Sequence, residues 1–114
     1  MTHIFKILPA ADWRRALAAG LFEGSAVDLS DGFIHFSAAD QVVETSRRYF
    51  RGQGDLVVLV VEAESLGGDL RWESSRGGQL FPHLYAPLDC EKVVAVRPAP
   101  LMADGVPDLG GLAP

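Results

Sequence analysis

The sequence has a single cysteine, no excess of positive charge and no long apolar run. Because Cys90 has no partner in the 114-residue chain, an intramolecular disulfide cannot form, which fits a reducing compartment. The longest apolar run, 56–61, falls far short of the roughly 20 residues that span a bilayer. The N-terminus also lacks the apolar segment of a signal peptide. We therefore expect a cytoplasmic protein without a membrane segment.

Lysine and arginine are outnumbered by acidic residues, 10 against 15, which gives a formal net charge of −5. Proteins that coat duplex nucleic acid need clustered positive charge, so this balance argues against a nucleic-acid partner. Arg47 and Arg51 share a face near the end of a predicted helix. They either hold a phosphate or simply complement the helix dipole.

The chain is rich enough in apolar residues, at 48%, to form a packed core. At roughly 100–200 residues per domain, its length predicts a single domain. We expect this domain to cover residues 1–98, because the proline and glycine of 99–114 predict an extended C-terminal tail.

Hydrophobic periodicity predicts an α+β fold with a compact, split and mixed β-sheet and two helices in the N-terminal half. Helices are expected at 10–19, where Gly20 supplies a stop signal, and at 38–50. Strands are expected at 4–8, 33–36, 56–62, 70–73 and 92–97, with an extended segment at 80–88. Segment 21–29 is expected to be irregular and 74–79 to be a mobile loop.

The strong catalytic motifs are absent: no nucleophile elbow, P-loop, dinucleotide-binding loop, zinc-protease helix or Cys-x-x-Cys pair occurs. The most informative segment is Gly-Phe-Ile-His-Phe-Ser at 32–37. It places His35 two residues before Ser37, the expected N-cap of the second helix. Because a helix N-terminus attracts anions, His35 and Ser37 are candidates to bind a phosphate or carboxylate. The alternative is that His35 is a structural strand residue.

A second informative segment is Phe-Pro-His-Leu-Tyr-Ala-Pro-Leu at 81–88. If it is extended, His83 and Tyr85 point to the same side, where they can position a ligand and transfer protons. Glu73, at the end of a predicted strand, is a candidate base or hydroxyl-orienting group. The alternatives are an aromatic loop that caps the core and a solvated carboxylate.

Two further kinds of site are argued against. His35, His83 and a carboxylate lack the ligand spacing of a metal site, so no metal is predicted. Acidic neighbours on both sides of Cys90 raise the pKa of its thiol, which argues against a reactive thiolate.

An ordered set of segments resembles a known family. They are 4–7, 12–13, Gly20, 31–37, Gln41, 49–50, 72–73 and 81–88. The pair of motifs G-F-I-H-x-S and F-P-H-x-Y-x-P-L is specific, and the whole set is similar to an uncharacterised bacterial and plant domain of unknown function. The resemblance extends over about residues 3–98, nearly the whole chain outside the expected tail.

That resemblance implies an ADP-ribosyltransferase-like fold, in which a split sheet surrounds a nucleotide cleft. The cofactor stays unknown, with NAD as a candidate. In transferases of that fold, a histidine or arginine on the first strand holds the NAD ribose. This chain carries Lys6 there. Lysine has neither an acceptor nitrogen nor an aromatic ring, so Lys6 weighs against NAD-dependent chemistry.

The leading hypothesis is a transferase-like enzyme that binds a nucleotide or a phosphorylated, ADP-ribose-like ligand in a cleft lined by His35 and His83. The alternative is a non-catalytic domain that binds a small ligand or another protein. The residues assigned to catalysis are His35, His83, Tyr85 and Glu73, and those assigned to ligand binding are Lys6, Ser37, Phe81 and Trp72.

Overall fold

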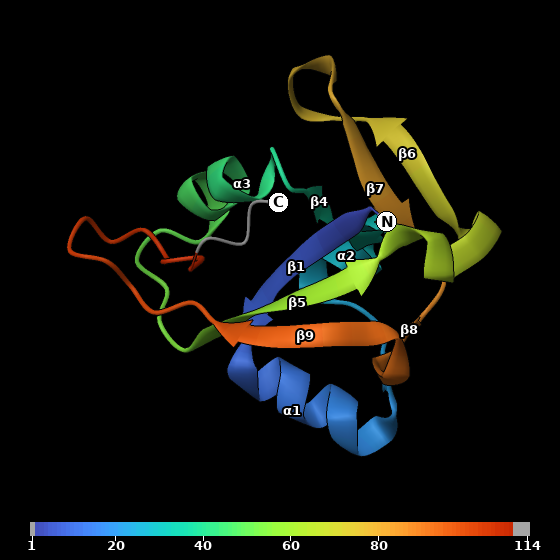
Figure 1. Cartoon of the computed structure of the whole chain (residues 1–114), viewed down its shortest axis with the longest axis horizontal. Coiled ribbons are helices and arrows are strands. Elements are labelled where there is room, and N and C mark those ends of the chain that lie inside the picture. Colours follow the sequence, from blue (N-terminus) through green and yellow to red (C-terminus); the bar gives the residue numbers. More distant parts are fainter. Residues whose placement is uncertain (1, 111–114) are drawn as a thin grey trace.

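The computed structural model describes residues 2–110, with the exception of the Arg76 side chain. Its elements are β1 (His3–Pro9), α1 (Ala10–Ala19), β2 (Leu21–Phe22), α2 (Ala26–Asp31), β3 (Ile34–His35), β4 (Ser37–Ala38), α3 (Val42–Tyr49), β5 (Leu56–Glu62), η1 (Ala63–Asp69), β6 (Leu70–Ser74), η2 (Arg76–Gly78), β7 (Leu80–Leu84), β8 (Leu88–Asp89), η3 (Cys90–Lys92) and β9 (Val93–Pro98). The structure is α+β, as the sequence predicts, and its α-helices lie in the first half of the chain (Figure 1).

The largest sheet has the strand order β4-β1-β5-β9. The apolar strand β5 occupies the interior of this sheet and pairs with β1 from His3↔Glu62 to Pro9↔Leu56. β4 pairs only with Ile4 and Phe5 of β1. From Lys6 onward, this edge of β1 therefore has no strand partner among residues 2–110. The free edge borders the candidate functional site.

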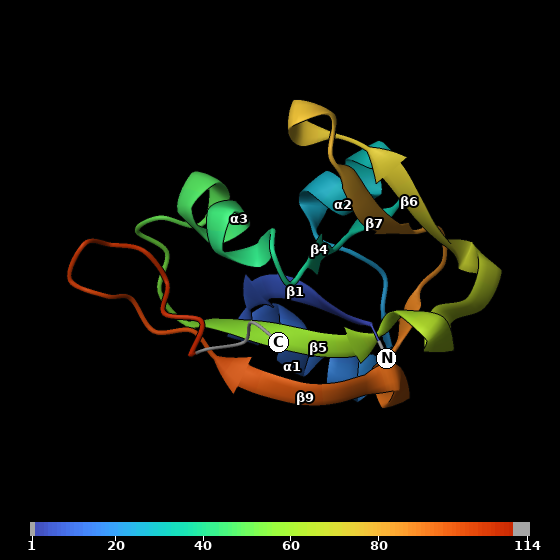
Figure 2. The same ribbon diagram turned by 45° about the horizontal axis from the view of Figure 1, so that its top comes forward.

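A second sheet, β3-β7-β6, stands away from the first, and β2 pairs with β8 (Figure 2). In the second sheet His35 lies directly opposite His83, while Glu73 of β6 lies opposite Phe81. The sheet is thus split, as expected. The expectation of a mixed sheet is wrong, because every strand pair in the described part of the chain is antiparallel.

Alternation along β1 and β5 separates two apolar clusters on the two faces of the main sheet. The first cluster packs against α1 and includes Ile4, Leu8, Trp13, Ala16, Leu59 and Val61. The second packs against α3 and includes Phe5, Ile7, Val42, Val58 and Val60. The clusters hold α1 and α3 on opposite faces of the sheet (Figure 2).

The first predicted helix is confirmed as α1, which ends at Gly20 in the left-handed conformation with φ 84°. The second begins later than expected: α3 starts at Val42 with Gln41 as its N-cap. Ser37 does not cap it, because the main chain at Ser37 pairs with β1 instead. No helix within the described residues has the length and apolar character needed to cross a membrane.

Helix α2 begins inside segment 21–29, which was expected to be irregular, and extends to Asp31. It begins with a capping box, in which Ser25 is the N-cap and Asp28 is the third helical residue, and it ends at Gly32 with φ 88°. This Ser-x-x-Asp pattern is a known start signal for a helix, although glutamate is more usual at the last position. Helix α2 brings acidic side chains toward β1 and β3.

The C-terminal segment adds buried side chains to the core. Ala99 and Leu109 belong to the second apolar cluster, and Val106 is also buried. A single β-bridge joins Leu101 and Pro107. The part of the expected tail up to residue 110 therefore packs on the domain, and residues 111–114 lie outside the described residues.

Candidate functional site

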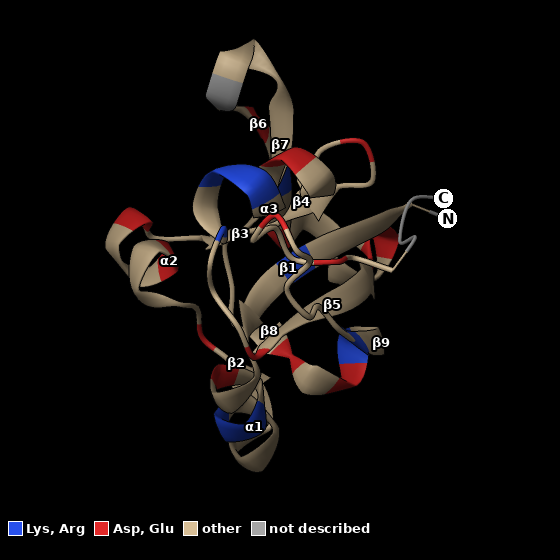
Figure 3. Ribbon diagram, turned by 90° about the vertical axis from the view of Figure 1, so that its left-hand side faces the viewer, with Lys and Arg blue, Asp and Glu red and all other residues tan. Residues whose placement is uncertain are grey.

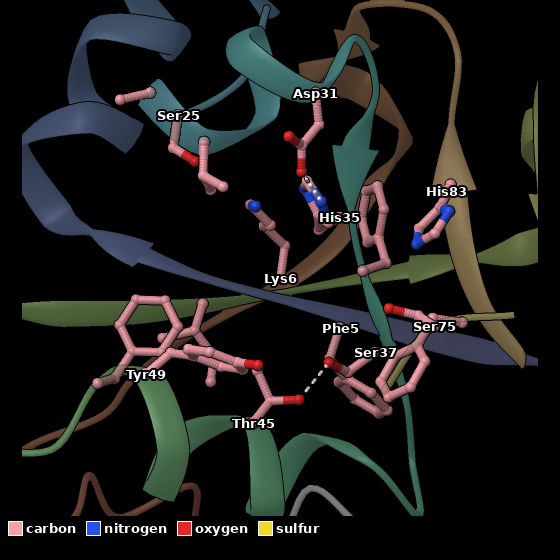
Figure 4. Close-up of a pocket in the computed structure, with 16 residues that line it drawn as sticks. Phe5, Lys6, Ser25, Asp31, His35, Ser37, Thr45, Tyr49, Ser75 and His83 are labelled. Carbon is pink, nitrogen blue, oxygen red and sulfur yellow. Dashed lines mark hydrogen bonds and ion pairs between the residues drawn. The ribbon is translucent and has the colours of Figure 1, made fainter. Parts of the chain in front are cut away.

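A cleft of about 570 Å³ opens between the free edge of β1, helices α2 and α3, and strand β7 (Figure 4). Aromatic side chains form much of its wall: Phe5, Phe36, Tyr49, Phe50 and Phe81. Polar side chains also line it: Lys6, Ser25, Asp31, His35, Ser37, Thr45, Ser75 and His83. Its volume lies within the range of about 300–1,000 Å³ that is typical of small-molecule sites.

Asp28 lies at the centre of a buried polar cluster beside this cleft. Its Oδ2 accepts hydrogen bonds from Lys6 Nζ at 2.8 Å, from the Ser25 backbone N–H at 2.9 Å and from the Ser25 hydroxyl at 3.0 Å. Its Oδ1 accepts from Lys6 Nζ and from the His35 backbone N–H, both at 3.1 Å. Both carboxylate oxygens therefore face donor groups, which favours the ionised form.

The ion pair between Lys6 and Asp28 is almost closed to solvent, with side chains that are 7% and 1% exposed. Burial alone would raise the pKa of Asp28, but the hydrogen bond from His35 and the charge and hydrogen bond of Lys6 hold this pKa well below its usual value. Burial lowers the pKa of Lys6, and the attraction of Asp28 opposes that shift. The positive charge of Lys6 is thus largely neutralised by the Asp28 carboxylate.

His35 is held through both of its ring nitrogens. Nδ1 lies 2.6 Å from Oδ1 of Asp28, and Nε2 lies 2.9 Å from Oδ2 of Asp31. Both contacts are hydrogen bonds only when each nitrogen carries a proton. The aspartates come from one short helix, three residues apart, so α2 fixes the ring from both sides.

His83 is held by Glu73 on the neighbouring strand. Nδ1 of His83 lies 2.8 Å from Oε1 of Glu73, and the Tyr85 hydroxyl donates to the same oxygen at 2.7 Å. The hydrogen bonds from Tyr85 and then His83 lower the pKa of Glu73, and the Glu73 carboxylate in turn raises the pKa of Tyr85. Phe33 stacks on the His83 ring with a centroid distance of 4.1 Å, and the Arg71 guanidinium lies 5.0 Å from the centroid of Tyr85.

The four residues assigned to catalysis from the sequence meet in one cluster. The His35 and His83 rings have centroids 5.5 Å apart, and Glu73 joins His83 to Tyr85. Both histidines line the cleft, whereas Glu73 and Tyr85 lie behind His83 and are not part of the lining. The segments 32–37 and 81–88 come together because β3 and β7 pair in antiparallel register.

The residues assigned to ligand binding divide into two groups. Lys6, Ser37 and Phe81 line the cleft. Trp72 does not line it: this side chain is 41% exposed, and it stands between Arg71 and Glu73, which point to the opposite side of β6.

The expected position of Ser37 at the N-terminus of the second helix is wrong. Ser37 belongs to β4, and its hydroxyl lies 3.0 Å from that of Thr45. Helix α3 starts only at Val42, so its first N–H groups are not presented by Ser37.

Asp28, Asp31 and Ser25 were not identified as site residues from the sequence. The signal that could have found them is the spacing Ser25-x-x-Asp28 followed by Gly32, which marks a short capped helix. This helix carries acidic residues, and the last turn of α3 carries Arg47 and Arg48 (Figure 3). The lining of the cleft holds one lysine, already paired, and the carboxylate of Asp31.

Two predicted absences concern metal and thiol chemistry. Among the residues that the structure describes, no group of three or more histidine, cysteine or acidic side chains is arranged to hold a metal ion. Burial and the nearby carboxylate of Asp89 raise the pKa of Cys90, in the direction expected from the sequence.

Comparisons with known proteins give similar solved structures and a matching family model. The chain is similar to protein CC0527 from Caulobacter crescentus, with which it shares 60% sequence identity. The crystal structure of that protein matches this structure with a TM-score of 0.93, and the match covers 96% of each chain. The solution NMR structure of the same protein matches at 60% identity with a TM-score of 0.87, over 96% of this chain and 95% of that one. No curated protein matches. The family model for a protein of unknown function, DUF952, matches residues 7–96. The chain therefore belongs to the DUF952 family.

Proposed function

We propose that the protein binds a small, uncharged molecule that combines a planar ring with hydroxyl groups, as a nucleoside does. The observation that carries this proposal is the cleft of about 570 Å³, which joins aromatic walls to a polar end. Phe36 and Phe81 offer apolar surface for a planar ring. The polar end supplies both donors and acceptors for ligand hydroxyls.

The polar end of the cleft can form hydrogen bonds with the hydroxyl groups of an uncharged ligand. Lys6 has three N–H donors and the carboxylate of Asp28 presents only two oxygens to them, so one donor remains for the ligand. Asp31 has a second oxygen, and His83 has a second ring nitrogen, each of which can accept a hydroxyl proton. A ribose-like diol matches this set of groups.

The charge of the cleft favours a neutral ligand over a phosphorylated one. Within the described lining of the cleft, Lys6 is paired with Asp28, and His35 is paired with Asp28 and Asp31, so no unpaired cation is available to bind a phosphate. NAD and ADP-ribose, the ligands suggested by the ADP-ribosyltransferase-like fold expected from the sequence, each carry a diphosphate. They are therefore weaker candidates than a nucleoside.

Calorimetric titration of the full chain with adenosine, AMP and NAD tests the proposal. We expect adenosine to bind and to bind at least about tenfold more tightly than AMP, because the dianionic phosphate would lose hydration in the cleft without meeting an unpaired cation. Tighter binding of AMP or NAD would overturn the uncharged class and favour the phosphorylated ligand predicted from the sequence. Absence of binding by all three at millimolar concentration would overturn the nucleoside-like ligand altogether.

A pair of neighbouring variants shows whether the cleft is the binding site. Ser75 lines the cleft, whereas Ser74 is exposed and does not. The substitution Ser75→Trp fills the cleft and should abolish adenosine binding, and Ser74→Trp should leave it unchanged. Equal effects of the two substitutions would place the ligand elsewhere.

A further inference from the structure

We propose that His83 is the proton-accepting group of the cleft, with Nε2 as the accepting atom and Glu73 as the residue that positions the ring. This inference rests on the proposed function, since it assigns chemistry to the same cleft. It also assigns different roles to the two histidines of the cleft, because His83 accepts a proton and His35 does not.

The first support is that His83 has one ring nitrogen in use and one available. Nδ1 is bound by Glu73, which lies outside the cleft lining, while the ring itself lines the cleft. Within the described part of the chain, Nε2 has no hydrogen-bond partner. No fully buried side-chain nitrogen or oxygen there lacks a partner, so Nε2 must remain accessible from the cleft. The residue as a whole is only 5% exposed.

The second support is that Glu73 fixes which nitrogen carries the proton. A carboxylate accepts hydrogen bonds and does not donate them, so Nδ1 of His83 is the protonated nitrogen and Nε2 carries the lone pair in the neutral ring. The Tyr85 hydroxyl holds the same carboxylate oxygen, and Phe33 stacks on the ring. Three side chains therefore hold the ring in one orientation.

The third support is the contrast with His35. Both nitrogens of that ring face aspartate oxygens, at 2.6 and 2.9 Å, so neither is left to accept a proton from a ligand. The rings lie 5.5 Å apart between centroids, so the two roles are divided within one cleft. His35 is suited to donate or to hold charge, and His83 is suited to accept.

The chemical step is a proton transfer from a hydroxyl group of the bound ligand or of a water molecule. The O–H bond breaks, its electron pair stays on oxygen, and the proton forms a bond with Nε2 of His83. The resulting imidazolium is stabilised by the Glu73 carboxylate on Nδ1. The groups with charge or titratable protons around the ring are Glu73, Tyr85, Arg71 and His35.

Acylation by diethyl pyrocarbonate tests the inference on the folded full-length chain, because this reagent reacts with an imidazole nitrogen that has a free lone pair. Peptide mapping by mass spectrometry reports each of the three histidines separately. His3, which is exposed, serves as the internal reference. We expect His83 to react at least about tenfold faster than His35. Faster reaction of His35, or no reaction of His83 while His3 is modified, would overturn the proposal.

Long-range ¹H–¹⁵N spectra of the imidazole rings test the positioning role of Glu73. In the neutral ring of the wild-type protein, the proton of His83 should reside on Nδ1. Tyr85→Phe keeps the contact between Glu73 and His83 and should preserve this state, whereas Glu73→Ala should move the proton to Nε2. An unchanged spectrum in Glu73→Ala would show that Glu73 does not position the ring.

Adenosine added during acylation separates the two proposals. Protection of His83 supports both the cleft as the ligand site and His83 as a group that the ligand covers. Selective acylation of His83 without protection by adenosine would overturn the nucleoside-like ligand and leave the assignment of His83 intact.

Discussion

Replacing Asp28 by asparagine should be among the most damaging single polar substitutions in this domain. The change preserves the shape of the side chain but converts one carboxylate oxygen into an NH₂ donor. Both oxygens of Asp28 face donors: Lys6 and His35 on one side, and Lys6 and Ser25 on the other. The new NH₂ group therefore meets a donor in either orientation, and Lys6 loses its counter-ion in a buried site.

Breaking a buried ion pair by removing one partner costs about 3–5 kcal/mol, because the remaining charge is left without compensation. Domains are typically stable by about 5–15 kcal/mol, so this loss is a large fraction of the total. The control is Asp40→Asn: Asp40 is exposed, and its replacement should change the free energy of unfolding by less than about 0.5 kcal/mol.

The contribution of Asp28 to the free energy of unfolding should decrease as the pH falls. Because the folded protein holds the pKa of Asp28 well below its unfolded value of about 3.9, the stabilisation is fully present above that value and is lost as the pH falls toward the folded value. One proton contributes about 1.4 kcal/mol per pH unit in that window. The difference in the free energy of unfolding between the wild-type protein and Asp28→Asn should therefore narrow by about 1.5 kcal/mol between pH 4 and pH 2.5, because the unfolded-state carboxyl is only about half protonated at pH 4.

Urea unfolding with linear extrapolation, at pH 7, 4 and 2.5, measures these differences. A second variant, Lys6→Met with Asp28→Asn, removes both charges and should recover part of the loss. Two results would refute the role assigned to the buried pair. One is a loss of less than about 1 kcal/mol in the free energy of unfolding of Asp28→Asn at pH 7, and the other is a difference from the wild-type protein that stays constant down to pH 2.5.

Three further predictions use other parts of the chain. Gly24→Ala should cost about 1–3 kcal/mol, because Gly24 has φ 123° and an added Cβ would lie 2.8 Å from Cβ of Asp28; Gly54→Ala, which has open space, should be nearly neutral by thermal unfolding. Cys90 should be alkylated more slowly at pH 8 than a free thiol, since burial and Asp89 raise its pKa, and an equal rate would contradict this. Ultraviolet titration should show a tyrosine that ionises above pH 10, and Tyr85→Phe should remove it, because the hydrogen bond to Glu73 raises the pKa of Tyr85.

Elements governed by a long apolar pattern were predictable from the sequence. The run at 56–62 became the interior strand β5, and the periodicity at 10–19 became α1, because such patterns report burial directly. The start of α3 was not predictable in the same way. The local sequence around Ser37 fits a helix N-cap. In the structure, however, the main chain of Ser37 pairs with Phe5 of β1, which is remote in sequence.

The site was only partly predictable for the same reason. His35 and His83 were found as members of unusual motifs, and antiparallel pairing of β3 with β7 brings them together. The partners that decide their chemistry came from different kinds of segment. Glu73 lies on a strand that the sequence indicates, whereas Asp28 lies in a stretch whose composition predicts irregular structure. In the folded protein this carboxylate is buried and lies at the centre of the polar cluster.

The most direct test of the account is the site at which a nucleoside perturbs the amide spectrum. Titration of the ¹⁵N-labelled chain with adenosine should shift the backbone amides around α2, β3 and β7, including those of Ala26, Val27, His35 and His83, whose residues line the cleft. Amides along β9, which lies at the far edge of the main sheet, should remain unchanged. Shifts confined to β9, or no shifts at millimolar adenosine, would contradict the claim that this cleft binds a nucleoside-like ligand.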